Sequence, residues 1–291
     1  MLDIVFESLK SSGLIRADAR FRYNVGLTLG DVLHLAVRCE DDRYYHIRLS
    51  EQFDLAQEYA SSLRAYERFP EFVPQPLAYL HHRNMQWIVT TGVRAKPVIE
   101  EDLLRLRRNS SLHRGLIGFF LRAREQAGEP YSKDDAFGLI EGIDSRFSET
   151  ELSNTCSRVT GSIDIDSLTT LSHAPQHGDF SVNNLALGKL GLTVFDWEDF
   201  GRVTLQGFDL AILVSSMMRF EPMRLEELRA TDGLKPNDDL GWIGDACIAL
   251  GIDFGRFRKM LPLYLLQFLM LKDLYSRPIR RRVEKAILAL V

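Results

Sequence analysis

Three side chains that carry oxygen donors lie close together in one stretch of the sequence. In segment 176–201, QHGDFSVNNLALGKLGLTVFDWEDFG, Asp179 is followed five residues later by Asn184, and Asp196 ends a short apolar run. Phosphoryl transfer requires an acceptor hydroxyl held in line with the phosphorus atom and a Mg²⁺ ion that neutralises phosphate charge. Mg²⁺ prefers hard oxygen ligands, so Asn184 and Asp196 are candidate metal ligands, with nucleotide phosphates and water completing the shell. Asp179 is the candidate group that accepts the hydrogen bond and the proton of an acceptor hydroxyl.

The same segment predicts the elements that position these groups. Two short apolar runs, 185–187 and 192–195, flank a Gly-Lys-Leu-Gly turn, which is typical of a β-hairpin. The second strand ends directly on Asp196. An aspartate at a strand end, an asparagine in a turn and a structural histidine at 177 are each ordinary features, so the prediction depends on their combined order.

In that order, the segment resembles the catalytic loop and metal-binding strand of the aminoglycoside phosphotransferase and choline kinase family. This family is related more distantly to the protein kinases, whose loop reads HRD-x4-N. The resemblance implies that Asp179 is the catalytic aspartate, that Asn184 and Asp196 bind the metal, and that His177 supports the loop without reacting.

The resemblance continues beyond the loop. Trp197 and Glu198 follow Asp196 as in the D-W-E that is frequent in the family, and segment 207–211 (GFDLA) resembles its G-x-D-L-A motif. In that motif the aspartate, here Asp209, braces the catalytic loop. Glu198 is also explained as an ordinary solvated acid.

The rest of the chain predicts the fold class: α+β, bilobal and protein-kinase-like. Short alternating apolar runs at 21–27, 32–37, 44–49 and 85–91 indicate strands, with a helix over 52–69 and a break at Pro74 and Pro76. Residues 1–91 therefore form a small N-terminal nucleotide-binding lobe, an antiparallel sheet plus a helix, in the family's order. Residues 92–291 form a larger, mostly helical lobe with the catalytic loop and the acceptor site. Helices are expected at about 101–107, 112–127, 133–147, 207–219, 240–250, 254–275 and 279–291.

One position departs from the family pattern. The family carries a lysine on its third strand, paired with a glutamate on the following helix and touching the α- and β-phosphates. Here strand YYHIRLS places Arg48 at that position, with Glu58 as its expected partner. Arginine is longer and planar, so the exchange is not conservative. Three interpretations follow: Arg48 contacts phosphates with altered geometry, Arg48 forms a structural ion pair in a weak nucleotide binder, or the predicted strand register is wrong.

The remaining nucleotide contacts are predicted by position alone. A phosphate-covering loop is expected over 23–31, where Gly26 and Gly30 would let backbone N–H groups approach phosphate oxygens. A plain hairpin explains two glycines equally well. A hinge whose backbone faces the nucleobase is expected near 90–94, around Thr91 and Val93.

The acceptor is expected in the helical lobe beside Asp179. A set of acidic residues suggests a cationic acceptor, although charges on helices are usually solvated: Asp134, Asp135, Glu141, Asp144, Glu198 and Asp199. The sequence therefore predicts a kinase that uses ATP or GTP with Mg²⁺ and phosphorylates a hydroxyl of an aminoglycoside-, amino-alcohol- or sugar-like molecule. The alternative is a kinase-like binding or scaffold protein, weak or inactive because of Arg48.

Composition excludes several other classes. The 291 residues are 45% hydrophobic and carry a net charge of -4, which argues against a dedicated nucleic-acid binder. No segment has the pattern of a signal peptide or a membrane span, and 260–271 is expected to be a buried helix. Cys39, Cys156 and Cys247 are too few and too far apart for a disulfide framework, so we expect free thiols and a cytoplasmic location. Acceptor, nucleotide choice and oligomeric state stay open.

Overall fold

The structure is a computed structural model that describes residues 2–27, 32–106, 109–231, 233–234, 238–272 and 277–291. The chain packs into two compact units, residues 1–95 and 96–291.

Unit 1 contains a five-stranded antiparallel sheet in the order β1-β2-β3-β5-β4. Its strands are β1 (Phe21–Leu27), β2 (Leu33–Cys39), β3 (Tyr44–Ser50), β4 (Pro76–His82) and β5 (Met85–Thr91). The helical pattern ends before Pro74 and Pro76, as expected, but β4, which begins at Pro76, was not predicted. β4 is an edge strand, where a proline costs the sheet no ladder hydrogen bond.

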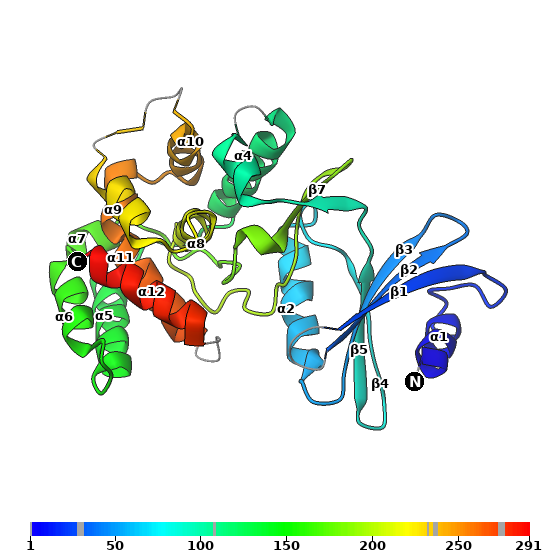
Figure 1. The fold of residues 1–291 in the computed structure, drawn as a ribbon. Coiled ribbons are helices and arrows are strands. Elements are labelled where there is room, and N and C mark those ends of the chain that lie inside the picture. The colour runs from blue at the N-terminus through cyan, green and yellow to red at the C-terminus, as the bar shows by residue number, and fades with distance from the viewer. Residues whose placement is uncertain (1, 28–31, 107–108, 232, 235–237, 273–276) are drawn as a thin grey trace. The chain divides into compact units, whose positions relative to one another are not determined.

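A helix covers each face of this sheet (Figure 1). Apolar residues of α1 (Leu2–Ser11), among them Val5 and Leu9, form one buried core with alternate residues of the strands, such as Ile47 and Val89. The opposite face meets α2 (Leu55–Arg68), which begins where the Asp54 carboxylate accepts a hydrogen bond from the amide of Ala56 at 3.0 Å. Because side chains alternate along a strand, the residues between the core positions of β3 face α2.

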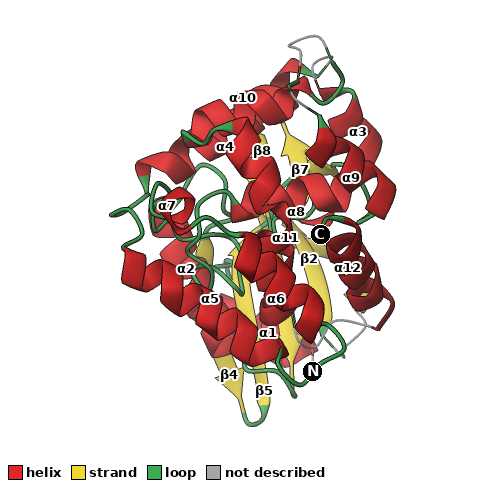
Figure 2. Cartoon of the chain, turned by 90° about the vertical axis from the view of Figure 1, so that its left-hand side faces the viewer, coloured by secondary structure: helices red, strands yellow, loops and turns green. Residues whose placement is uncertain are grey.

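Unit 2 is mostly helical, as Figure 2 shows in red. Its strands form a small sheet in the order β6-β7-β8, in which β7 and β8 are the predicted hairpin: β6 (Ala95–Pro97), β7 (Leu185–Gly188) and β8 (Gly191–Val194). The first helices are α3 (Glu100–Leu104), α4 (Ser110–Glu125), α5 (Lys133–Phe147), α6 (Ser153–Ser162), α7 (Ile165–Leu168) and the 3₁₀ turn η2 (Val182–Asn184). The later helices are α8 (Phe208–Met217), α9 (Pro222–Ala230), α10 (Gly241–Leu250), α11 (Phe254–Leu271) and α12 (Arg277–Ala289).

The core of unit 2 centres on α8, α10 and α11. Every residue from Met260 to Leu269 is buried, so the expectation of a buried helix is confirmed. Cys39, Cys156 and Cys247 are all buried free thiols, also as expected. Within the described part of the chain, no helix combines the length and the apolarity that crossing a membrane requires.

Candidate functional site

The hairpin brings Asn184 next to Asp196. The β7–β8 ladder pairs Leu185 with Val194, and one further hydrogen bond, from the amide of Phe195 to the carbonyl of Asn184 at 2.9 Å, extends it. The side-chain amide of Asn184 donates to the carbonyl oxygen of Asp179 at 2.8 Å. Asn184 is therefore hydrogen-bonded directly to Asp179, and it is linked to Asp196 through the neighbouring residue Phe195.

Asp196 has an unusual backbone conformation. Its φ of 64° lies in the left-handed region, which a residue with a Cβ atom enters at a cost of about 1–3 kcal/mol. Such strained residues cluster at functional sites, where the surrounding structure holds them. Here the conformation turns the chain away from β8 at the residue predicted to bind the metal.

His177 connects the loop to this strand. Its ring Nδ1 accepts a hydrogen bond from the amide of Asp179 at 3.1 Å, so Nε2 carries the proton that is donated to the carbonyl of Phe195 at 2.7 Å. Burial lowers the pKa of the imidazole, which is consistent with this neutral tautomer. Both ring nitrogens are thus engaged in holding backbone, the role that the resemblance implied for His177.

Asp209 holds the start of the same loop. Its carboxylate accepts hydrogen bonds from the amides of His177 at 2.8 Å and Gly178 at 3.2 Å, and its own amide donates to Gln176 Oε1 at 3.1 Å. Burial raises the pKa of Asp209 to about 7, although the two amide donors act in the opposite direction. The geometry is that of a brace between the first turn of α8 and the loop.

Aromatic side chains pack around the loop that carries Asp179. Phe180 is fully buried and stacks on Phe119 of α4 with a centroid separation of 4.3 Å. The Trp197 ring lies 4.5 Å from that of His177, and its indole N–H donates to the carbonyl of Val194 at 2.8 Å. Phe180 and Trp197 are thus buried at the two ends of the segment that carries Asp179, Asn184 and Asp196.

Lys272, which no motif in the sequence marks as functional, is part of the site. This residue follows α11, and its Nζ lies 2.5 Å from Asp199 Oδ2, 3.4 Å from Asp179 Oδ2 and 3.7 Å from Glu198 Oε1. Only the tertiary fold places the end of α11 beside the loop, so no local pattern could have revealed the contact.

In unit 1, Arg48 and Glu58 form the expected ion pair. Arg48 Nη1 lies 2.6 Å from Glu58 Oε1, and the two side chains are 22% and 12% exposed. The interpretation that the strand register is wrong is therefore excluded. Beside Arg48, Nδ1 of His34 lies 3.1 Å from Nε2 of His46.

The other predicted nucleotide contacts are placed as follows. Gly26 lies inside β1, paired with His34, so the expectation that it belongs to a loop was wrong. Gly30 lies outside the described residues. Thr91 ends β5, where its hydroxyl accepts a hydrogen bond from the amide of Gln75 at 2.8 Å, and Val93 is 38% exposed.

The acidic residues of α5 do not gather at the loop. Asp135 caps its own helix by accepting a hydrogen bond from the amide of Ser132, and Asp144 accepts one from the hydroxyl of Thr160. Asp134 and Glu141 are exposed. Of the six acids considered for a cationic acceptor, only Glu198 and Asp199 contact Lys272 beside Asp179.

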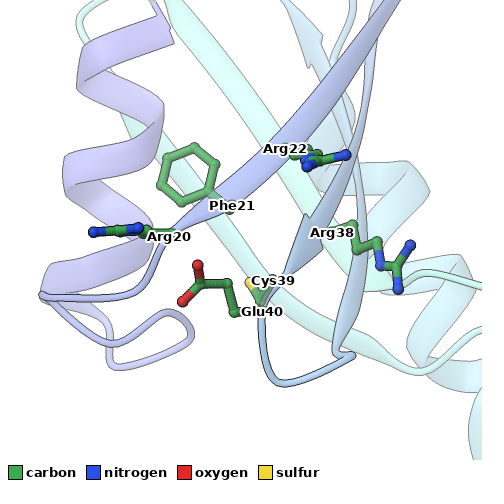
Figure 3. Close-up of a pocket in the computed structure, with 6 residues that line it drawn as sticks. All are labelled: Arg20, Phe21, Arg22, Arg38, Cys39 and Glu40. Carbon is green, nitrogen blue, oxygen red and sulfur yellow. The ribbon is translucent and has the colours of Figure 1, made fainter.

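Unit 1 also has a surface hollow of about 520 Å³, lined by three arginines among other residues: Arg20, Phe21, Arg22, Arg38, Cys39 and Glu40. Arg38 is bonded to Asp42 at 2.9 Å. Arg20 lies on the α1 side, whereas Arg22 and Arg38 extend to the other side, so their charges do not converge (Figure 3). None of the predicted site residues lines this hollow.

The donor set at Asn184 and Asp196 fits a hard divalent cation. The side-chain nitrogen of Asn184 donates to the carbonyl oxygen of Asp179. The side-chain oxygen of Asn184 therefore points away from Asp179 and is the atom that could bind a metal ion. One amide oxygen and one carboxylate make a partial Mg²⁺ shell, as expected where substrate phosphates supply further ligands. Among the described residues, no group of three or more His, Cys, Asp or Glu side chains forms a complete protein-only metal site.

Solved structures of the same fold cover nearly the whole chain. Choline kinase LicA from Streptococcus pneumoniae matches with a TM-score of 0.59 and 11% identity over 100% of this chain and 98% of its own. Macrolide 2'-phosphotransferase MphH from Brachybacterium faecium matches with a TM-score of 0.60 and 13% identity, covering 97% of each chain. The streptomycin–ATP–APH(2")-IIa ternary complex matches with a TM-score of 0.55 and 14% identity over 98% of this chain and 95% of its own.

These similarities define the class by fold. The α+β, protein-kinase-like fold that the aminoglycoside phosphotransferase and choline kinase resemblance predicted is confirmed. No family model matches the sequence. No curated protein matches it either.

Proposed function

We propose that the chain is a kinase that transfers the γ-phosphoryl group of ATP or GTP to a hydroxyl of a small molecule. The observation that carries this proposal is the close placement of Asp179, Asn184 and Asp196: Asn184 is hydrogen-bonded to Asp179 and to Phe195, the residue immediately before Asp196. Its fold neighbours support it, since they include a choline kinase, a macrolide 2'-phosphotransferase and one complex that contains ATP.

In this proposal, Asp179 accepts a hydrogen bond from the acceptor hydroxyl and aligns its oxygen with the γ-phosphorus. The oxygen forms a bond to phosphorus while the bond from phosphorus to the bridging oxygen breaks, and the nucleoside diphosphate leaves. The hydroxyl proton passes to Asp179. Mg²⁺ bound by Asn184 and Asp196 would neutralise phosphate charge. His177 and Asp209 hold the loop backbone and do not exchange protons with the acceptor.

Arg48 is the proposed phosphate contact from unit 1, oriented by Glu58. Its planar guanidinium can bind two phosphate oxygens at once, whereas the lysine of related kinases acts as a point charge. The same ion pair favours the second candidate function, a kinase-like binding protein, because Glu58 offsets part of the positive charge that Arg48 would offer to phosphates. Gly30, Thr91 and Val93 remain proposed nucleotide contacts through their backbone.

We also propose a chemical class for the acceptor and a cellular compartment for the protein. An aminoglycoside-, amino-alcohol- or sugar-like hydroxyl compound fits a site whose reacting group is a single aspartate. Three buried free thiols support a reducing compartment such as the cytoplasm.

Calorimetric titration with ATP and with GTP, each with and without Mg²⁺, tests the proposal. We expect Mg²⁺-dependent binding by the wild type and its loss in Asp196→Ala. Asp18→Ala, which removes an exposed carboxylate from unit 1, is the matched control and should bind as the wild type does. Absence of nucleotide binding by folded wild type would favour the binding-protein alternative, and transfer by Asp196→Ala at the wild-type rate would refute the metal assignment.

A further inference from the structure

The ammonium group of Lys272 is enclosed by carboxylates at the proposed acceptor side of the loop. Its closest partner is Asp199 at 2.5 Å, with Asp179 at 3.4 Å and Glu198 at 3.7 Å. The side chains of Lys272, Asp179 and Asp199 are only 10%, 12% and 7% exposed, whereas Glu198 is 44% exposed. The cluster therefore has a buried end at Asp199 and an open end at Glu198.

Backbone packing holds this arrangement in place. Gly178, at a φ of 94°, lies so close to its neighbours that a Cβ atom there would be 2.6 Å from the Cβ of Asp199 and 3.2 Å from Cδ2 of Leu271. The loop, Asp199 and the end of α11 thus meet at one point. Arg202 also fixes Asp199, with Nη1 2.7 Å from its Oδ1.

The charge of Lys272 is maintained by its surroundings. Burial acts against the charged form, but the carboxylates of Asp179, Asp199 and Glu198 outweigh it and raise the pKa of the ammonium above its ordinary value. Without Lys272, these carboxylates would leave a partly buried negative site next to the proposed catalytic Asp179. Arg202 would still pair with Asp199, but the loss of one counter-charge is costly for partly buried carboxylates and would make the cluster more attractive to a cation.

We propose that Lys272 is a specificity-determining residue: an internal ammonium group that occupies the position where a cationic acceptor would pair with Asp199 and Asp179. The acceptor is therefore a hydroxyl compound without a positive charge next to its reacting hydroxyl, such as a neutral polyol or sugar. This inference rests on the proposed function for its meaning, since it names the acceptor class of the same site. It also replaces the cationic acceptor that the acidic residues suggested from sequence.

Two small hydroxyl compounds of similar size test the inference: ethanolamine, which carries an ammonium group, and ethylene glycol, which is neutral. Each is titrated by ligand-observed NMR into wild type, Lys272→Met, Lys272→Arg and the double variant Lys272→Met/Asp199→Asn. We expect Lys272→Met to bind ethanolamine at least tenfold more tightly than the wild type, with no comparable gain for ethylene glycol. Lys272→Arg keeps the charge and should resemble the wild type, and the double variant should lose the gain.

If a folded Lys272→Met variant binds ethanolamine no more tightly than the wild type does, the inference is overturned. If the methionine variant does not fold, Lys272→Gln, which keeps a hydrogen-bond donor for Asp199, is interpreted by the same criteria. A parallel titration with Mg²⁺–ATP separates the two proposals. If the wild type does not bind Mg²⁺–ATP, the kinase function is contradicted. The difference in ethanolamine affinity between wild type and Lys272→Met depends only on the charge of the Lys272 cluster.

Discussion

Nε2 of His177 lies 2.7 Å from the carbonyl oxygen of Phe195, the residue immediately before Asp196. Since Nδ1 of the same ring accepts the amide of Asp179, one neutral imidazole connects the proposed catalytic aspartate to the proposed metal-binding strand. The histidine of an HxD loop is therefore a structural link in this chain. Its replacement should act on both residues at once.

We expect His177→Phe to lower the free energy of unfolding by about 2–3 kcal/mol, because two buried hydrogen bonds are lost and backbone groups are left unsatisfied. Denaturant unfolding measures the change. His82→Phe alters an exposed histidine of unit 1 and should change stability by less than about 0.5 kcal/mol. An equally small effect at His177 would contradict its linking role.

Asp179→Asn removes the proposed proton acceptor while keeping the size of the side chain. We expect phosphoryl transfer to fall by about 10²–10⁴-fold, the usual contribution of a positioned general base. Affinity for Mg²⁺–ATP should change little, since Asn184 and Asp196 are retained. A coupled assay for ADP release, with calorimetry in parallel, measures both quantities. Asp134→Asn on the exposed surface of α5 is the control, and wild-type transfer by Asp179→Asn would refute the assignment.

The Arg48–Glu58 ion pair should couple the two residues energetically. A double-mutant cycle with Arg48→Met and Glu58→Gln is expected to give a coupling energy of about 1–3 kcal/mol, because both side chains are largely buried. The exposed pair Arg16–Asp18 should give less than about 1 kcal/mol in the same cycle. Coupling at Arg48–Glu58 as weak as in that control would show that the pair does not orient the arginine.

A comparison of Arg48→Met with Arg48→Lys distinguishes the two candidate functions. If Arg48 contacts phosphates, Arg48→Met should weaken Mg²⁺–ATP binding by more than about tenfold, which is the cost of one charge-assisted contact. Arg48→Lys, which keeps the positive charge, should retain most of the wild-type affinity. Calorimetry provides the measurement. Unchanged nucleotide affinity in Arg48→Met would assign the arginine a structural role only.

His46 makes the stability of unit 1 depend on pH. Burial, together with the nearby His34 and Arg48, lowers the pKa of His46 to about 4. The unfolded chain, with a histidine pKa of about 6.5, binds a proton between these values that the folded protein does not bind. The stabilising contribution of neutral His46 is therefore complete above pH 6.5 and is lost as the pH falls towards about 4.

Denaturant unfolding of wild type and His46→Gln at a series of pH values tests this sign. The stability of the wild type relative to the variant should decrease by about 1–3 kcal/mol from pH 7 to pH 4. A relative stability that stays constant, or that increases on acidification, would contradict the assignment. His82→Gln, which changes an exposed histidine, supplies the baseline.

The sequence predicted best those parts of the site that are local. The hairpin, the loop and the start of α8 are encoded by residues close in the chain, and the Arg48–Glu58 pair follows from one strand and the next helix. Helix α6 was missed because SNTCSRVTGS contains few strong helix formers, and packing of Cys156 and Val159 stabilises it instead. Lys272 was missed as a site residue because only long-range packing of α11 brings it to Asp179.

The position of α1 also determines how the protein can be handled in the laboratory. Val5 and Leu9 complete a hydrophobic core with Ile47 and Val89, so a truncated version starting after residue 12 would expose one face of the sheet to water. Exposed apolar faces of this kind promote aggregation. Recombinant protein should therefore retain the first helix.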